Sequence, residues 1–265
     1  MEKMSGVLAE NMKYINGRLG VGTNFDVLYR VMEIGGRQAC FYMIDGFCKD
    51  EVMQKLMQHF IGITPDKMPA DAHTMSKQLV PYGEVDLKDS WEEIEYCVMS
   101  GVVALFIDGY DRCILIDART YPARGVAEPE KDKVLRGSKD GFVETVVFNT
   151  ALIRRRIRSP QLRMEMLKAG STSQTDIVVC YMQDRVDQTF LQKIKDRIGQ
   201  LKVDALTLNQ ESLAECLYQR RWYNPFPKFK YTERPDTAAA QVLEGNIIIL
   251  VDNSPSAMIT PTTFF

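Results

Sequence analysis

The chain has 265 residues, of which 45% are apolar and 26% charged, and its formal net charge at pH 7 is −2. This composition is typical of a globular protein and excludes fibrous and disordered classes. The near-zero charge excludes a general attraction to nucleic acid, so we expect no nucleic-acid partner.

Metal, cofactor and enzyme signals are absent from the sequence. The two histidines, His59 and His73, have no cysteine or acid at metal-ligand spacing, and the six cysteines form no Cys-x-x-Cys pair. We find no GxSxG or HExxH motif. We therefore predict reduced thiols, no metal, no cofactor and no enzymatic activity.

No membrane-spanning or secretory segment is predicted within the chain. The longest apolar runs, "GVVALFI" and "NIIILV", are far shorter than the roughly 20 residues of a spanning helix. The N-terminus lacks the apolar region of a signal peptide. We expect the chain as given to be soluble, and its end at Phe264-Phe265 suggests a stop just before an apolar segment.

The first half begins with a helix-ending loop and a predicted hairpin. The glycine-rich "GRLGVG" (17–22) precedes a strand instead of following one, so it indicates a loop and not a dinucleotide site. The strands "VLYRVMEI" (27–34) and "RQACFYMI" (37–44) are joined by Gly35-Gly36, which is a strong hairpin signal.

An internal repeat relates the two halves. "EYCVMSGVVALFIDG" (95–109) aligns with "AAQVLEGNIIILVDN" (239–253) at an offset of 144, so that Gly101 matches Gly245. Each segment predicts a helix with a glycine stop, a buried strand and an acidic turn. A second pair, starting at Cys40 and Val178, aligns at offsets of 139 and 138, with Tyr42 on Tyr181 and Gln54 on Gln192. We interpret the pattern as a duplication.

Acidic residues follow the predicted strands at four places, Asp45, Asp108, Asp184 and Asp252. They can form turns by bonding to nearby amides, or act as ligands at the edge of a sheet. Their repetition in both halves favours the turn role.

Between the halves a long connector leads into a helix, "VETVVFNTALIRRRIRS" (143–159), and then into a predicted short helix, "QLRMEMLKAG" (161–170). The first helix carries a basic cluster, Arg154, Arg155, Arg156 and Arg158. The cluster suits phosphate, anionic lipid or nucleic acid. The alternative, which we favour, is ion pairing with the nearby acids Glu128, Glu130, Asp132 and Asp140.

The segment "YNPFPKFKYTERPD" (223–236) leads into the last helix of the second half. Pro235 and Asp236 suit a first helical turn, and Phe226, Phe229 and Tyr231 can anchor the segment in the core. Glu233 and Arg234 have no evident local role, so we predict that they form a buried or inter-subunit ion pair and not a ligand site.

These patterns predict an α/β fold of two similar small α/β subdomains, with mixed sheets flanked by helices. We expect an N-terminal subdomain over residues 1–121 and a connector with the basic helix over 122–159. A C-terminal subdomain is expected over 160–265, ending before a further apolar segment.

Two long strings resemble the GerA family of spore germination proteins: "PARGVAEPEKDKVLRGSKDGFVETVVFNTALIRRRIRSPQLRMEMLKAGSTSQTDIVVCYM" and "NPFPKFKYTERPDTAAAQVLEGNIIILVDNSPSAMITPTTFF". The family contains the A subunits of spore germinant receptors and the stage V sporulation AF branch. "RGSKDGF" (136–142) looks more like the AF branch, because receptor A subunits more often have proline at Ser138 and Arg-Glu at Lys139-Asp140.

The resemblance implies a spore inner-membrane protein whose soluble N-terminal region faces the spore core. It implies self-association of the full-length protein into an ion-channel-like complex, with other germination membrane proteins as partners and no catalytic residues. One alternative is an A subunit of a nutrient receptor. Another is a soluble module that binds a small, unknown ligand between its halves, in the manner of solute-binding proteins.

Overall fold

The computed structural model describes residues 3–120, 140–201, 210–217 and 228–262. The chain forms two compact units, which are treated separately below. Unit 1 contains residues 1–121 and 158–160, and unit 2 contains residues 122–157 and 161–265. The basic helix therefore belongs to unit 2, apart from Arg158.

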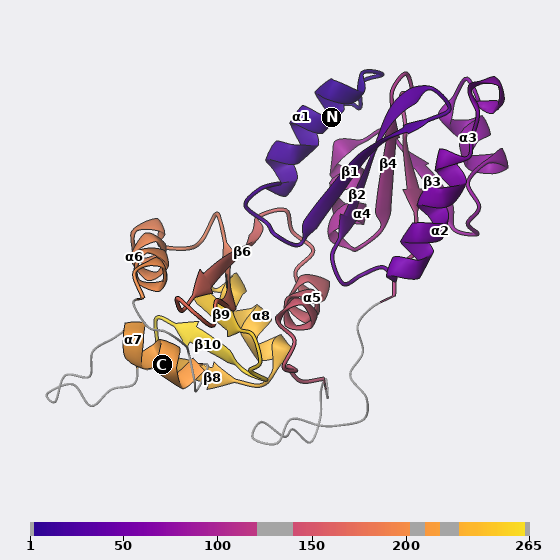
Figure 1. Cartoon of the computed structure of the whole chain (residues 1–265). Helices are drawn as coiled ribbons and strands as arrows, with labels where there is room; N and C mark the ends of the chain where they lie inside the picture. Colours follow the sequence, from indigo (N-terminus) through magenta and orange to yellow (C-terminus); the bar gives the residue numbers. More distant parts are fainter. Residues whose placement is uncertain (1–2, 121–139, 202–209, 218–227, 263–265) are drawn as a thin grey trace, which may run out of the picture. The chain divides into compact units, whose positions relative to one another are not determined.

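Unit 1 is a five-stranded sheet covered by helices on both faces (Figure 1). Helices α1 and α4 pack on one face, and α2 and α3 pack on the other. In chain order the elements are α1 (Leu8–Leu19), β1 (Val27–Ile34), β2 (Arg37–Ile44), α2 (Asp50–Ile61), the short 3-10 helix η1 (Pro65–Lys67), α3 (Ala72–Gln78), β3 (Val85–Lys88), α4 (Trp91–Met99), β4 (Val103–Ile107) and β5 (Cys113–Ile116).

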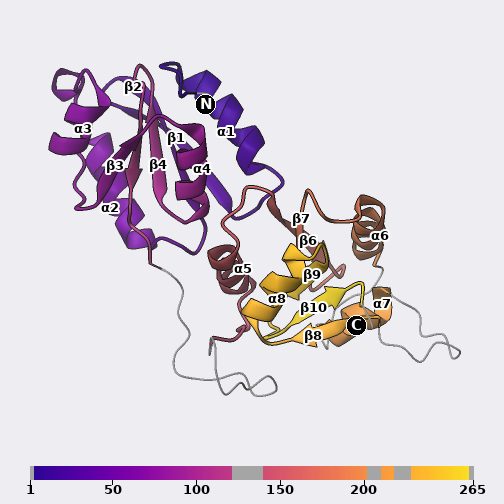
Figure 2. The same cartoon turned by 180° about the vertical axis from the view of Figure 1, so that it is seen from behind.

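Unit 2 repeats the same order of elements, as seen from both sides in Figures 1 and 2. They are α5 (Val146–Arg156), β6 (Leu162–Ala169), β7 (Thr175–Met182), α6 (Gln188–Gly199), α7 (Gln210–Leu217), β8 (Lys230–Thr232), α8 (Pro235–Leu243), β9 (Ile247–Val251) and β10 (Ala257–Thr260). The strand orders, β1-β2-β4-β5-β3 and β6-β7-β9-β10-β8, match position by position. The prediction of two similar α/β halves is confirmed.

All strand pairs in the described sheets are antiparallel, so the expectation of mixed sheets is wrong in this detail. The strands β3 and β4 run in the same direction, as the connecting helix α4 requires, but β5 lies between them. This arrangement is a split β-α-β motif. The strands β3 and β8, which create it, were not predicted from the sequence.

The predicted short helix over residues 161–170 is wrong, because this segment is strand β6. All eight of its residues pair with β7, from Leu162 opposite Met182 to Ala169 opposite Thr175. Leucine, methionine, glutamate and lysine favour helices locally, but a full-length ladder and cross-strand packing outweigh that preference. The alternation of buried Leu162 and Met164 with half-buried Arg163 and Glu165 is the strand signal that was overlooked.

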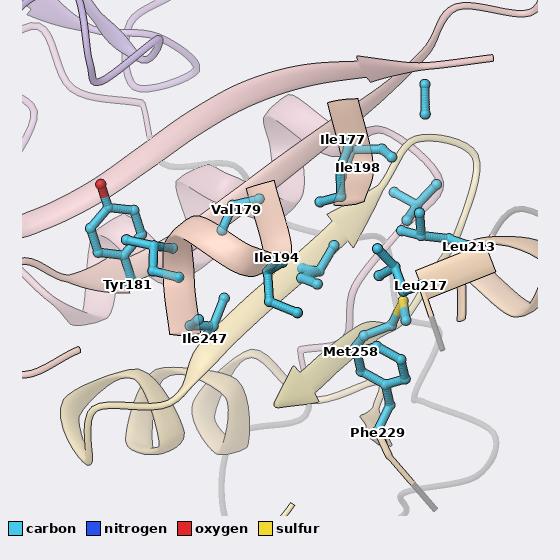
Figure 3. Packing of buried hydrophobic residues seen from close by; sticks show 14 of the residues in the cluster. Ile177, Val179, Tyr181, Ile194, Ile198, Leu213, Leu217, Phe229, Ile247 and Met258 are labelled. Carbon is cyan, nitrogen blue, oxygen red and sulfur yellow. The ribbon is translucent and has the colours of Figure 1, made fainter. Parts of the chain in front are cut away.

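The structure also corrects the alignment of Tyr42 with Tyr181. Ala39 lies opposite Ile107 and Ile177 lies opposite Val251, so β2 and β7 correspond at the single offset of 138. A shift of one residue moves a side chain to the other face of a sheet. Tyr181 therefore lies in the core on the side of the sheet covered by α6 (Figure 3), whereas Tyr42 contacts Asn16 of α1.

In both units a glycine with a positive φ ends the helix that precedes the central buried strand. Gly101 and Gly245 follow α4 and α8 with φ of 94° and 97°, so the predicted glycine stops are confirmed. Each glycine is tightly packed, since an added Cβ would lie 2.5 Å from the ring of Phe47 at Gly101 and 2.9 Å from the carbonyl oxygen of Arg185 at Gly245.

Two of the four strand-end acids hold the first helix of their unit. The Leu8 N–H donates to Asp108 Oδ1 at 2.9 Å, and the Val146 N–H donates to Asp252 Oδ1 at 3.1 Å. These bonds satisfy helix N-termini whose own N-cap residues, Val7 and Thr145, make no side-chain cap bond. Both acids therefore act structurally on amides distant in sequence, and Asp252 also accepts a hydrogen bond within its own turn, from the side-chain amide of Asn253 at 3.1 Å.

Candidate functional site

The basic cluster predicted on α5 divides into residues with different surroundings. Arg154 is fully buried and its Nη1 donates to the carbonyl of Leu162 at 3.3 Å. Arg155, one position further on, is exposed. Because Arg154 is 0% exposed, its guanidinium links α5 to the start of β6 inside the unit and cannot present a charge to a partner.

Arg156 joins α5 to the segment that precedes it. One of its guanidinium nitrogens donates to Asp140 Oδ2, and another donates to the carbonyl of Leu152 at 2.8 Å. Both charged side chains are about four-fifths covered, with exposures of 21% for Arg156 and 23% for Asp140. Asp140 is one of the four acids considered as partners, whereas Glu128, Glu130 and Asp132 lie outside the described residues.

Arg158 makes its described contact in unit 1, apart from the other three arginines. Its guanidinium donates to the hydroxyl of Tyr96 on α4 at 3.2 Å. This hydrogen bond lowers the pKa of the Tyr96 phenol. The structure thus separates the four basic residues into one that is buried, one that is exposed, one that is paired within unit 2 and one that contacts unit 1.

The segment before α8 carries the other two predicted residues. The backbone carbonyl of Glu233 accepts the N–H of Phe142 at 2.9 Å. Arg234 forms a two-pronged ion pair with Asp236, with Nε donating to Oδ1 at 3.0 Å and Nη2 donating to Oδ2. Arg234 therefore has a local role that the sequence analysis missed, because its partner lies two residues away in the first turn of α8.

Arg156 and the α8 entrance share one electrostatic neighbourhood, because α5 packs against α8. Burial raises the pKa of Asp236, but hydrogen bonds from Arg234 and the Thr237 amide and the positive charge of Arg156 outweigh it and hold the pKa below its usual value. We refer to Asp140, Arg155, Arg156, Arg234 and Asp236 as the α5–α8 charge cluster. Within it, Arg156 is paired with Asp140, Arg234 is paired with Asp236, and the charge of Arg156 also acts on Asp236.

The prediction of aromatic core anchors in this segment is confirmed for Phe229 and wrong for Tyr231. Phe229 is buried in the core of unit 2, next to Leu217 and Met258 (Figure 3). Pro235 is buried at the first position of α8. Tyr231 is 44% exposed, so it is not a core anchor, and Phe226 lies outside the described residues.

A second polar cluster, between β6, β7 and α6, was not predicted. The hydroxyl of Tyr181 and the Nζ of Lys195 both donate to Glu165 Oε1, and the Lys195 ammonium lies 5.2 Å from the centre of the Tyr181 ring. Burial, with a further contribution from Glu165, raises the pKa of Tyr181, so the phenol stays protonated. The prediction of a helix over 161–170 hid this cluster, because only strand pairing brings Glu165 next to Tyr181.

The described residues were also compared with the geometry of metal sites and membrane spans. Over residues 3–120, 140–201, 210–217 and 228–262 no group of three or more His, Cys, Asp or Glu side chains is arranged to hold a metal ion. No helix among the described residues is long and apolar enough to cross a membrane. All six cysteines are free thiols, as predicted.

Comparison with known proteins gives one consistent result. The model of the Bacillus/Clostridium GerA spore germination protein family matches residues 13–265. Stage V sporulation protein AF of Bacillus subtilis (strain 168) is 40% identical over 258 residues, which cover 97% of this chain and 52% of that protein. Uncharacterized membrane protein YfkQ of the same organism is 32% identical over 242 residues, covering 91% of this chain and 47% of that protein.

A solved structure extends the similarity to the fold. The N-terminal domain of the A subunit of the Bacillus megaterium spore germinant receptor GerK3 superposes with a TM-score of 0.75 and 26% identity, covering 100% of this chain and 98% of that domain. The chain spans about half the length of the curated relatives described here. The chain belongs to the GerA family of spore germination proteins.

Proposed function

We propose that the chain is the N-terminal, cytoplasmic (spore-core-facing) domain of a spore inner-membrane protein that acts in germination, in the manner of stage V sporulation protein AF. The domain has no chemical reaction of its own in this proposal. It self-associates through the full-length protein and, with other germination membrane proteins, assembles and regulates an ion-channel-like complex.

The proposal rests mainly on how much of each relative this chain covers. The chain matches 98% of a domain described as the N-terminal domain of a receptor A subunit, yet only 52% of stage V sporulation protein AF. The other half of such a protein is available for a different task. The relative YfkQ is named a membrane protein, which supports a membrane location for that half.

The α5–α8 charge cluster is the part of unit 2 that we assign to contact with a partner. Arg155 is exposed on α5 next to Arg156 in the sequence, and the charge of Arg156 acts on Asp236 of the Arg234–Asp236 pair. Charges of both signs suit a protein partner with a complementary pattern, since charge complementarity gives specificity and register. A uniformly basic patch, which would suit lipid phosphates, is not what this side of unit 2 presents.

The proposal is tested in spores that express the full-length protein with Arg155→Gln. We expect slower ion release and slower germination, with unchanged abundance of the protein in the inner membrane. Lys193→Gln, which removes an equal charge from α6 on the other face of the unit 2 sheet, serves as the matched control and leaves germination unchanged. Normal germination of spores that lack the protein altogether would overturn the germination role.

A second candidate function is that of an A subunit of a nutrient receptor. The structural match to the GerK3 A subunit domain favours it, as does 29% identity over 251 residues to spore germination protein KA of Bacillus subtilis (strain 168). The two candidates differ in one response. We expect deletion of a receptor subunit to abolish germination with a particular nutrient, and deletion of an AF-like protein to slow germination with all nutrients.

A further inference from the structure

The edge strand β1 of unit 1 exposes apolar side chains along its length. Leu28, Tyr29 and Val31 are 41%, 49% and 46% exposed. Natural edge strands are usually short, charged or covered, because an open strand edge pairs with other chains. The opposite edge of the same sheet follows that rule, since β3 has four residues and carries Asp86 and Lys88.

The equivalent strand of unit 2, β6, has more deeply buried side chains than β1, which makes an internal comparison possible. Val27 pairs with Ile44, and Leu162 pairs with Met182, so the two hairpins share one register. Tyr29 therefore corresponds to Met164, which is fully buried. The exposure of β1 is a property of its own sequence and surroundings and not a consequence of the shared fold.

The backbone of β1 also presents unpaired groups to the outside in a defined pattern. The amide of Asp45 donates to the carbonyl of Asp26 at 2.8 Å, immediately before β1. Since antiparallel pairs alternate between hydrogen-bonded and non-hydrogen-bonded, even-numbered residues of β1 bond to β2. The N–H and C=O groups of Tyr29, Val31 and Glu33 therefore point away from the sheet.

When a second copy of β1 lies antiparallel along this edge, the registers centred on Arg30 and on Val31 pair the largest number of its residues. When two identical antiparallel strands are related by a twofold axis, the residue numbers of any two opposed residues add up to the same total. This total is even, because opposed side chains lie on the same face of the sheet. Centring on Arg30 places two arginines face to face, which is destabilising. Centring on Val31 instead sets Tyr29 opposite Glu33 and Arg30 opposite Met32, with no like charges opposed.

We propose that β1 is a dimer interface, at which two copies of this chain pair antiparallel about Val31 and join their two five-stranded sheets. The seam uses the outward backbone groups of Tyr29, Val31 and Glu33 and covers the exposed apolar side chains. A seam of one strand from each copy is smaller than the roughly 1,200–2,000 Å² of stable complexes. The dimer is therefore weak, with a dissociation constant of about 10–100 µM.

This proposal rests on unit 1 alone and goes beyond the proposed function. Sedimentation equilibrium of the 265-residue chain, at about 1–500 µM to span the dissociation constant, tests it. Val31→Lys sets two cations face to face at the axis and raises the dissociation constant about tenfold or more. Ile61→Lys, at a position on α2 that is 63% exposed, leaves it unchanged.

Cysteine cross-linking tests the register and does not depend on the behaviour of the lysine variant. In the proposed pairing the two Val31 Cα atoms are about 5.5 Å apart, within reach of a disulfide, so Val31→Cys forms a covalent dimer on mild oxidation. The two Leu28 positions are six residues out of register, about 20 Å apart. Leu28→Cys, at similar exposure, therefore gives the background of the native thiols.

Two results overturn the proposal. The first is a chain that stays monomeric over the whole concentration range and gives no covalent dimer above background with Val31→Cys. The second is a dimer whose dissociation constant is the same for the native chain, Val31→Lys and Ile61→Lys, because its interface then lies elsewhere. Neither result affects the germination role, which is measured in spores.

Discussion

Replacing Asp252 by alanine removes the carboxylate that accepts the first amide of α5. The Val146 N–H then loses its partner at 3.1 Å, and Thr145 supplies no side-chain cap in its place. Loss of a cap costs about 1 kcal/mol, in a range of roughly 0.5–2, and loss of the negative charge at a helix N-terminus costs a further 0.3–1 kcal/mol or so. We expect Asp252→Ala to lower the free energy of unfolding of unit 2 by about 1–2.5 kcal/mol.

Asp252→Asn separates the two contributions, because the amide oxygen can still accept the hydrogen bond while the charge is lost. Its expected cost is the charge contribution alone, about 0.3–1 kcal/mol. Asp184→Ala serves as the control, because Asp184 also follows a strand but is about half exposed and lies 3.7 Å from Arg185. An exposed pair of this kind contributes little, so we expect a change within about 0.5 kcal/mol.

The assay must resolve the units, because a chain of two units need not unfold in a single step. Calorimetry gives the transition of unit 2, with a shift of about 2–4 °C expected for each kcal/mol. Hydrogen exchange of the α5 amides shows whether the loss is local to that helix. Equal effects of Asp252→Ala and Asp184→Ala would refute the reasoning, as would a larger loss from asparagine than from alanine.

Three further predictions concern unit 2. Gly245→Ala should destabilise it by about 2–4 kcal/mol in calorimetry, because φ is 97° and the new Cβ would lie 2.9 Å from a carbonyl oxygen. The control Gly199→Ala, in open space at the end of α6, should cost nothing. Arg154→Ala should cost about 2–4 kcal/mol, since a buried side chain and its bond to a carbonyl are lost, and Arg155→Ala should stay within about 0.5 kcal/mol in the same denaturation assay. The pKa of Asp236 is lowered, so its contribution to the stability of unit 2 is present above the ordinary pKa of aspartate and is lost as the pH falls through the lowered value. Melting temperatures measured from neutral to acid pH should therefore fall less for Asp236→Asn than for the native chain.

Much of the fold follows from local sequence patterns. The strands β4 and β9 are uninterrupted apolar runs, which indicates burial on both faces, and all their residues are buried. Gly101 and Gly245 end the helices before them because glycine alone adopts a positive φ without strain. The Gly35-Gly36 hairpin was predictable for the same reason.

The candidate site was far less accessible to sequence reasoning. The run of arginines on α5 is visible in the sequence, but whether each is buried, exposed or paired depends on what packs against that face of the helix. Arg154 is covered because β6 begins beneath it, and Arg156 meets the field of Asp236 because α8 packs against α5. When residues 161–170 are predicted as a helix, β6 and its contact with Arg154 are lost, so the burial of Arg154 could not be predicted.

The sequence by itself determined where buried strands and helix ends lie, because those depend on apolar runs and on the backbone freedom of glycine. Tertiary structure alone decided that residues Leu162–Ala169 form a strand, since eight cross-strand pairs outweigh the helical preference of leucine, methionine, glutamate and lysine. It also decided that Met164 is buried while its counterpart Tyr29 is exposed. Burial is a property of the surrounding packing, and two segments with the same register can differ in it completely.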